Sequence, residues 1–169
     1  MRIRDATDAD IQPILAIYND VVLNTTAIYD ERPSTLEERQ AWFEARRRAG
    51  FPILVAELED DGSVVGFSTF GEWRSRWGYR YTVEHSVHVR ADCRGRGYGR
   101  ALIEALFPRA AALGMHMMIG HIDCAATASL RLHERLGFTR VGTFHEVGKL
   151  RSGWVSVVAM QRQILPATS

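Results

Sequence analysis

The 169-residue sequence has few cysteines, no long apolar run and almost no excess of charge of either sign. Its two cysteines, Cys93 and Cys124, cannot make the disulfide framework of a small secreted domain, so we expect free thiols in a reducing compartment. No stretch approaches the roughly 20 apolar residues that span a bilayer. The charged segment from Met1 to Asp10 also lacks the apolar core of a signal peptide. We therefore expect a cytoplasmic protein that does not engage membranes.

The net charge and the residues that could bind a metal exclude further classes of function. A formal net charge of +1 gives no general attraction for nucleic acid, so we expect no nucleic-acid partner. The six histidines and two cysteines lack paired spacings such as C-x-x-C or H-x-x-x-H, so we expect no metal. Internal repeats, low-complexity tracts and linkers are absent as well, so we expect a single domain over residues 1–169.

Hydrophobic periodicity predicts alternating strands and helices. Strands are expected at 1–6, 53–57, 64–73, 79–89, 115–122, 141–147 and 154–161, and helices at 8–23, 34–49, 99–113 and 127–136. Ser34 and Glu37 have the spacing of a capping box for the second helix, and Pro108 is expected to kink the third. The run from Arg46 to Arg48 is expected to be a solvated helix end. The order βααβββαβαββ predicts a mixed α/β sheet with helices on both faces.

A glycine-rich turn joins the fourth strand to the third helix, with the sequence Arg94-Gly95-Arg96-Gly97-Tyr98-Gly99. Free N–H groups at a helix start, the helix dipole and nearby arginines together suit a pyrophosphate. The spacing fits neither the dinucleotide motif G-x-G-x-x-G nor a Walker A loop. Two alternatives stay open: a tight turn with solvated arginines, and a nucleic-acid contact through Arg90 and its neighbours.

The turn resembles the acetyl-CoA signature [RQ]-x-x-G-x-[GA] of the GNAT acetyltransferases, with Arg94, Gly97 and Gly99 in the specified places. Three other segments, 82–87, 132–138 and Met160-Gln161, are similar to the branch that acetylates phosphinothricin, methionine sulfone and methionine sulfoximine. The resemblance covers nearly the whole chain in motif order. It implies the GNAT fold, in which a mixed, mostly antiparallel sheet carries helices on both faces and splays to form an acetyl-CoA cleft.

The resemblance also implies which residues bind acetyl-CoA as co-substrate. The strand segment before the turn should pair with the pantetheine arm, the turn should hold the pyrophosphate, and the fourth helix should add a hydroxyl. These residues are Val87, His88, Val89, Arg94, Gly95, Arg96, Gly97, Gly99, Arg100 and Ser129. Relatives often carry Asn in place of Ala126, so one polar contact to the cofactor is in doubt.

Acetyl transfer to an amine needs a base, because an amino-acid ammonium has a pKa near 8 or above. Glu84 lies on the polar face of its strand and matches the family position of the general base, acting directly or through a water. His133 occupies a position where many members carry a Tyr that can protonate the leaving thiolate. The alternatives are a Glu84 that only pairs with an arginine and a His133 that only packs in the core.

The predicted substrate site is rich in arginine and aromatic residues. Arg74 and Arg76, two apart in an extended segment, suit a carboxylate and a second polar group, and Tyr79 adds a hydroxyl. By resemblance these residues and Tyr29 contact a zwitterionic amino acid whose side chain ends in a tetrahedral phosphinate, sulfone or sulfoximine. Relatives in this branch tend to be homodimers. Alternatives are an arginine-rich surface loop, a protein N-terminal or other small-amine acetyltransferase, and a non-catalytic acyl-CoA sensor.

Overall fold

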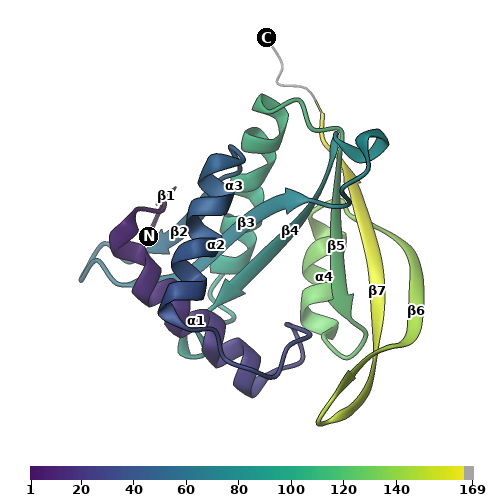
Figure 1. The fold of residues 1–169 in the computed structure, drawn as a ribbon, viewed down its shortest axis with the longest axis horizontal. Coiled ribbons are helices and arrows are strands. Elements are labelled where there is room, and N and C mark those ends of the chain that lie inside the picture. Colours follow the sequence, from purple (N-terminus) through teal and green to yellow (C-terminus); the bar gives the residue numbers. More distant parts are fainter. Residues whose placement is uncertain (166–169) are drawn as a thin grey trace.

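The computed structural model describes residues 1–165, in which seven strands form one sheet in the order β1-β2-β3-β4-β5-β7-β6 (Figure 1). All neighbouring strands run antiparallel except β4 and β5, which are parallel. This confirms the mixed, mostly antiparallel sheet and the element order. The strands are β1 (Arg2–Asp5), β2 (Ile53–Glu57), β3 (Val64–Glu72), β4 (Thr82–Val89), β5 (Met117–Asp123), β6 (Thr139–Leu150) and β7 (Gly153–Gln163).

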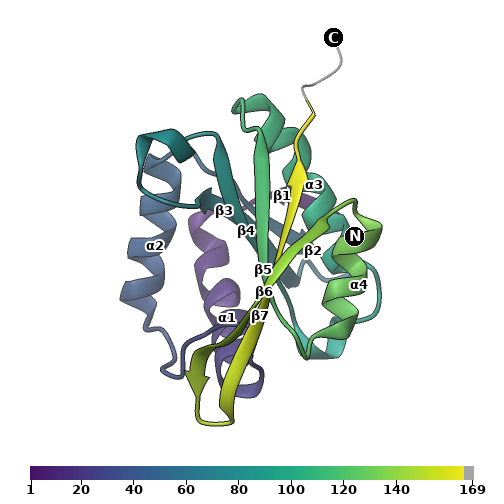
Figure 2. The same ribbon diagram turned by 90° about the vertical axis from the view of Figure 1, so that its right-hand side faces the viewer.

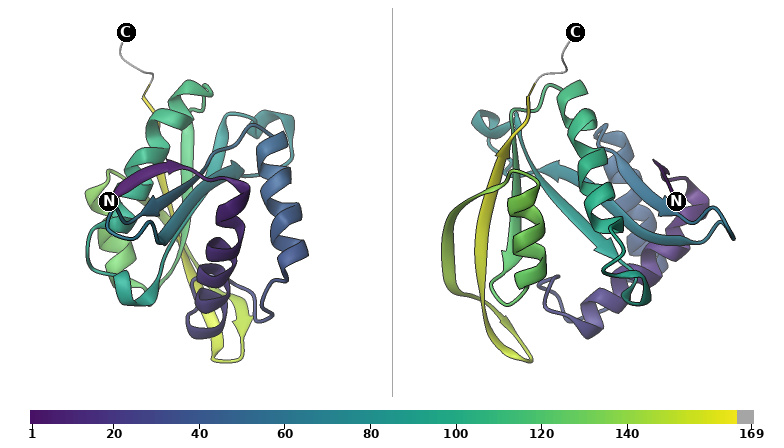
Figure 3. Two further views of the ribbon diagram at one scale, coloured as in Figure 1. Left: turned by 90° about the vertical axis from the view of Figure 1, so that its left-hand side faces the viewer. Right: turned by 180° about the vertical axis from the view of Figure 1, so that it is seen from behind.

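Helices cover both faces of the sheet, as Figure 2 shows edge-on and Figure 3 shows from two further sides. Helices α1 (Ile11–Asn24) and α2 (Leu36–Arg48) lie on one face, and α3 (Tyr98–Ala112) and α4 (Thr127–Arg135) lie on the other. Short 3-10 turns precede α1, β4 and α3: η1 (Asp8–Asp10), η2 (Trp77–Tyr79) and η3 (Ala91–Cys93). Helix α3 continues through Pro108 to Ala112, so this proline, which was expected to kink the helix, does not end it.

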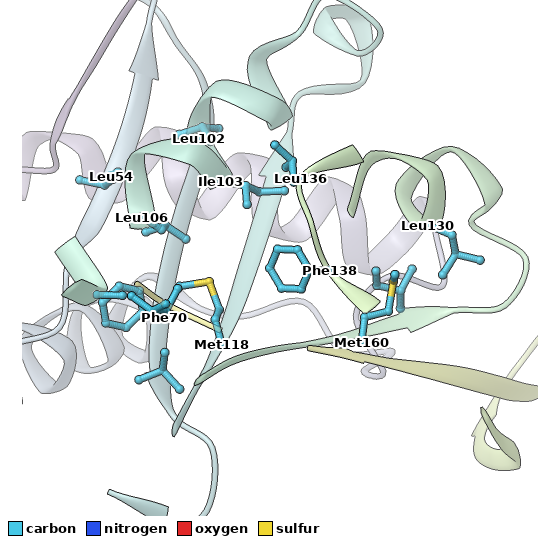
Figure 4. Close-up of a cluster of buried hydrophobic side chains, with 14 of the residues drawn as sticks. Leu54, Phe70, Leu102, Ile103, Leu106, Met118, Leu130, Leu136, Phe138 and Met160 are labelled. Carbon is cyan, nitrogen blue, oxygen red and sulfur yellow. The ribbon is translucent and has the colours of Figure 1, made fainter. Parts of the chain in front are cut away.

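Each helical layer encloses its own apolar core. The larger core lies between the sheet and the α3–α4 layer, where Phe70, Leu102 and Met118 are fully buried (Figure 4). The smaller core joins α1 and α2 to the opposite face around Ile14, Phe43 and Phe67. Since successive residues of a strand point to opposite faces, β4 sends Val83 into the larger core and Glu84 toward the α1–α2 side.

The predicted strand 79–89 is too long at its start. Residues Trp77–Tyr79 form a 3-10 turn, in which the N–H of Arg80 donates to the carbonyl of Trp77, and β4 begins only at Thr82. Tyr79 and Tyr81 are therefore exposed and do not continue the buried face of the strand. Alternation alone could not reveal this, because a turn can interrupt a sequence that keeps a two-residue pattern.

The capping box of α2 lies one residue later than predicted. Thr35 is the N-cap: its hydroxyl accepts from the N–H of Glu38 at 3.2 Å, and its own N–H donates to the Glu38 carboxylate at 2.8 Å. Ser34 does not cap the helix. Its N–H donates to Oδ1 of Asn19, and its carbonyl accepts from Nδ2 of Asn19.

This difference predicts unequal effects of two alanine substitutions. Thr35→Ala should lower the free energy of unfolding by about 1 kcal/mol, because an N–H of the first turn of α2 loses its acceptor. Ser34→Ala keeps the backbone bonds to Asn19 and should change it by less than about 0.5 kcal/mol. Urea denaturation followed by circular dichroism measures both. Equal losses in the two variants would contradict this assignment of the cap.

Candidate active site

Strands β4 and β5 pair over only part of their length. The register runs from Thr82 opposite Met117 to Glu84 opposite Ile119, although β4 continues to Val89 and β5 to Asp123. Figure 1 shows the two strands side by side at one end and diverging toward the other. Beyond Glu84, the backbone groups of β4 that face β5 have no partner in that strand, so they are free to bind an extended ligand.

A cleft of about 700 Å³ lies at the open end of this gap. Its walls come from the end of α1 and the loop that follows it, the end of β4, the glycine-rich turn, the first turn of α3, and α4. It brings together nearly all the residues predicted to bind acetyl-CoA: Val87, His88, Val89, Arg94, Gly95, Gly97, Gly99, Arg100 and Ser129. Arg96 is exposed and is not among the residues that line the cleft.

The glycine-rich turn presents backbone donors to this cleft. Gly95 and Gly97 have φ angles of 77° and 87°, in the left-handed region that glycine adopts without strain. A Cβ atom at either position would meet no other atom, so conformation and not space requires glycine here. Gly97 caps α3 without a side-chain hydrogen bond, which leaves N–H groups of the first turn available. This geometry fits the pyrophosphate of a coenzyme.

The arginines beside the turn are partly engaged within the protein. The Arg94 Nε donates to the carbonyl of Val89 at 3.1 Å, and its guanidinium lies 3.8 Å from the Asp20 carboxylate. Arg100 pairs with Glu104 at 2.9 Å. Both arginines line the cleft, so a phosphate there would meet side chains that are already oriented.

Glu84 forms the centre of the candidate site together with a histidine that the sequence did not single out. The Nδ1 atom of His121, in β5, lies 2.9 Å from Oε1 of Glu84. The side chain of Glu84 is 39% exposed and that of His121 is 25% exposed, so both are accessible. Glu84 lies three residues along β4 from Val87, which already lines the cleft. The available signal was that His121 is the one ionisable residue within an otherwise apolar segment, 117–122.

Arg46 also lies at this site, so the prediction of a solvated helix end is wrong for this residue. Its Nη1 donates to the carbonyl of Phe70 at 3.4 Å and rests against Gly71 of β3, the register partner of Glu84. Burial lowers the pKa of Arg46, and the charge of Glu84 acts in the opposite direction. Arg47 is exposed, as predicted for the helix end, and pairs with Asp8.

Tyr29 lies in the loop between α1 and α2, next to Gly148 of β6. Tyr29 is 41% exposed, and its partial burial, with the nearby charges of Asp123, Cys124 and Glu84, raises its pKa to about 12. Tyr29 therefore stays protonated at neutral pH and can donate a hydrogen bond. A hydrogen bond from the Thr26 hydroxyl to Asp123 ties this loop to the end of β5.

The other predicted substrate residues gather in a separate hollow of about 330 Å³, lined by Arg74, Ser75, Arg76 and Tyr79. The Arg74 guanidinium lies 4.8 Å from the ring centroid of Trp73, which packs edge-on against Tyr79 at 5.0 Å. The segment returns to the sheet at Thr82, two residues before Glu84. The structure thus brings Arg74, Arg76 and Tyr79 together, whereas Tyr29 is not part of this hollow.

The structure does not bring His133 together with Glu84. His133 is only 2% exposed and stacks on His85, which lies on the face of β4 opposite to Glu84. Its Nδ1 lies 2.7 Å from the carbonyl of Ser129 and its Nε2 lies 3.2 Å from Nε2 of His85. Because a carbonyl only accepts, Nδ1 donates and Nε2 must accept from His85. Neither nitrogen of His133 then keeps a free N–H for the cleft.

Residues 1–165 contain neither a candidate metal centre nor a membrane-spanning helix. No group of three or more His, Cys, Asp or Glu residues gathers there in a way that would hold a metal ion. None of the helices in this part of the chain is long and apolar enough to cross a membrane. Cys93 and Cys124 are both free thiols, the first of them buried.

Comparison with known proteins places this geometry in a family. The model of the acetyltransferase (GNAT) family matches residues 14–138. An L-methionine sulfoximine/L-methionine sulfone acetyltransferase of Pseudomonas paraeruginosa is 50% identical over 99% of this chain and 96% of its own length. A phosphinothricin N-acetyltransferase of Streptomyces coelicolor is 33% identical over 88% of each chain.

A solved structure from Salmonella typhimurium, determined with acetyl-CoA as its cofactor, is 42% identical and superimposes with a TM-score of 0.94. The match covers 100% of this chain and 96% of that one. The diverging strands, the glycine-rich turn at a helix start and these similarities agree with one another. The chain belongs to the GNAT family of acetyltransferases.

Proposed function

We propose that this protein transfers an acetyl group from acetyl-CoA to the α-amine of a small amino-acid analogue, namely phosphinothricin, methionine sulfone or methionine sulfoximine. One observation carries the proposal. The Glu84–His121 pair lies where β4 and β5 stop pairing, three residues before Val87, which lines the cleft that also contains the glycine-rich turn. The names of the Pseudomonas and Streptomyces relatives support the substrate class. The free thiols Cys93 and Cys124 are compatible with a cytoplasmic setting, which we also propose.

Acetyl-CoA would supply the activated acetyl thioester. The backbone of β4 from Val87 to Val89 would hold its extended arm, with His88 in the cleft wall. The turn from Arg94 to Gly99, including Arg96, and Arg100 would bind the pyrophosphate, and Ser129 would add a hydroxyl from α4. Ala126 is the N-cap of α4 and has no side-chain hydrogen bond, and its N–H donates to the carbonyl of Asp123. The contact that an Asn side chain would make to the coenzyme would therefore be missing.

Glu84 accepts a proton from the substrate ammonium in this proposal, directly or through a water. The carboxylate can only accept from His121, so Nδ1 of His121 donates and holds Oε1, leaving Oε2 for the proton. The neutral amine then has the lone pair that attack on the thioester carbonyl requires. As the amide C–N bond forms, the thioester C–S bond breaks, and coenzyme A leaves as a thiolate that takes up the proton released from the amide nitrogen through solvent. For His133 we propose a packing role in place of the predicted acid role, because both of its nitrogens are engaged within the core.

The arginine hollow and Tyr29 would bind the rest of the substrate. A phosphinate, sulfone or sulfoximine head offers tetrahedral oxygen or nitrogen acceptors that suit Arg74, Arg76 and the Tyr79 hydroxyl. Tyr29, protonated at neutral pH, would donate a further hydrogen bond. An unmodified methionine thioether is a far weaker acceptor, which supports selection for oxidised or phosphinate side chains.

A panel of amines tests the proposed function. Thiol release from acetyl-CoA is measured with phosphinothricin, methionine sulfone, methionine sulfoximine, glutamate, methionine, an aminoglycoside and a short peptide. Selective turnover of the first three supports the proposal. Turnover of the peptide alone would favour a protein N-terminal acetyltransferase, and binding of acetyl-CoA without turnover of any amine would favour an acyl-CoA sensor. Either of these outcomes would overturn the proposed substrate.

We also propose that the protein is a homodimer that uses the edge strand β6. This strand ends the sheet and exposes Val141, Phe144 and Val147 by more than half, together with Trp154 of β7. An open, apolar strand edge favours pairing with a second copy. Light scattering at micromolar concentration should give twice the 19.1 kDa chain mass, and Val141→Lys should shift the protein to the monomer. A monomer mass for the unsubstituted protein would contradict the proposal.

A further inference from the structure

Arg46 occupies a place that only a glycine neighbour makes possible. A Cβ atom on Gly71 would lie 1.2 Å from Nη1 of Arg46 and 2.3 Å from its Cζ. Gly71 does not have a positive φ, so the space taken by the guanidinium and not the backbone conformation requires glycine. Helix α2 thus places a cation directly on the surface of β3.

This cation lies beside Glu84 without pairing with it. Gly71 and Glu84 are register partners, and Cβ positions of directly opposite residues are roughly 5 Å apart on one face. The guanidinium therefore lies at about that distance from the Glu84 side chain. Within residues 1–165, the Arg46 guanidinium forms no ion pair. It makes one hydrogen bond, to the carbonyl of Phe70, and lies 6.0 Å from the ring centroid of Phe51. Most of its N–H donors are left for a ligand.

Two opposite charges that lie at this spacing without pairing with each other match the two charged groups of an amino acid. The ammonium and the α-carboxylate of such a molecule are bonded to one carbon, so they cannot lie far apart. If the ammonium lies on Glu84, as the proposed function requires, the carboxylate falls within reach of Arg46. The alternative cations, Arg74 and Arg76, lie in a hollow on the segment before β4.

We propose that Arg46 binds the α-carboxylate of the amino-acid substrate, an inference that rests on the proposed function. The arginine hollow then serves the side-chain head. This arrangement selects for free amino acids, because a peptide N-terminus carries an amide in place of the α-carboxylate. Arg46 is therefore a residue that determines specificity as well as affinity.

The experiment compares methionine sulfone with its α-carboxamide in acetyl-transfer assays. Arg46→Met keeps an extended apolar side chain but removes the charge, and it should raise KM for methionine sulfone by about 10- to 100-fold with a small effect on kcat. It should also abolish the preference for the acid over the amide. Arg46→Lys should restore part of both effects. Arg47→Met, in an exposed arginine one position along α2, should leave KM and the preference unchanged.

Gly71→Ala gives an independent test that keeps the arginine in the protein. The added Cβ must displace the guanidinium, so this variant should raise KM for the acid in the same way. An unchanged KM and an unchanged acid preference in folded Arg46→Met would overturn the inference. If Arg46→Met does not fold, an unchanged KM for methionine sulfone in Gly71→Ala would overturn it. The proposed function fails separately, if the unsubstituted protein acetylates none of the oxidised or phosphinate amino acids.

Discussion

Replacing Glu84 with Gln should lower kcat for acetyl transfer by about 10²- to 10⁴-fold at neutral pH, the range that a positioned general base contributes. The amide oxygen of Gln still accepts from His121, so the local geometry is kept and only the proton acceptor is lost. Binding of acetyl-CoA, measured by calorimetry, should be unchanged because the coenzyme cleft lies farther along β4. The residual rate should rise with pH until the free amine predominates, because solvent then removes the ammonium proton in place of Glu84.

Two further variants define what this result means. Glu72→Gln, at the exposed end of β3, should leave kcat unchanged, because its carboxylate is not part of the site. His121→Gln should cause a smaller loss, on the order of 10-fold, because Glu84 keeps its basic oxygens but loses the ring that orients it. A Glu84→Gln variant with undiminished kcat across pH 6–9 would rule out Glu84 as the base.

The fold and the coenzyme cleft could be predicted because their signals are local in the sequence. Apolar periodicity fixed the order of strands and helices, and the glycine-rich turn lies in one stretch that joins β4 to α3. Gly95, Gly97 and Gly99 are close in sequence and therefore lie together at the start of one helix, independently of how the rest of the chain folds. The whole cleft still depends on a contact between distant segments, since Ser129 reaches it from α4.

The two residues that sequence reasoning missed come from long-range pairing. His121 meets Glu84 only because β5 returns parallel to β4 after the whole of α3, and no local pattern encodes that register. Arg46 belongs to a run of three arginines, yet successive helical residues point about 100° apart, so only one of the three faces the sheet. Its spacing from the buried Phe43, three residues earlier, was the available signal.

His133 is the opposite case, in which a residue type suggested chemistry that its surroundings do not favour. Its place at a family position suggests a catalytic role, but the hydrogen bonds of its two ring nitrogens favour a packing role. Here one donates to the Ser129 carbonyl and the other accepts from His85, and Phe138 packs against both rings. The pair behaves as a neutral, hydrogen-bonded part of the core.

The buried pair should make the protein unusually sensitive to acid. Burial, with the charges of His133 and His88, lowers the pKa of His85 to about 3, and burial also lowers the pKa of His133. Both are below the value near 6.5 of the unfolded chain. The unfolded state therefore binds more protons as pH falls through 6.5, so the stabilisation is complete above that pH and is lost toward pH 3. His85 alone should contribute a slope of about 1.4 kcal/mol per pH unit across this window.

Urea denaturation at several pH values between 4 and 7.5 measures this slope in the unsubstituted protein and in His85→Gln. Glutamine does not ionise in this range, and its amide N–H can still donate to Nε2 of His133, so the core stays hydrogen-bonded. The variant should lose some stability at pH 7.5 but should show a slope that is smaller by about 1.4 kcal/mol per pH unit. His145→Gln, in an exposed histidine of β6, should leave the slope unchanged. If His85→Gln and the unsubstituted protein lose stability in parallel, the acid sensitivity comes from other groups. These include His88, whose burial lowers its pKa to about 4, and Asp10, whose burial is outweighed by hydrogen bonds from Arg4 and Thr7 that lower its pKa.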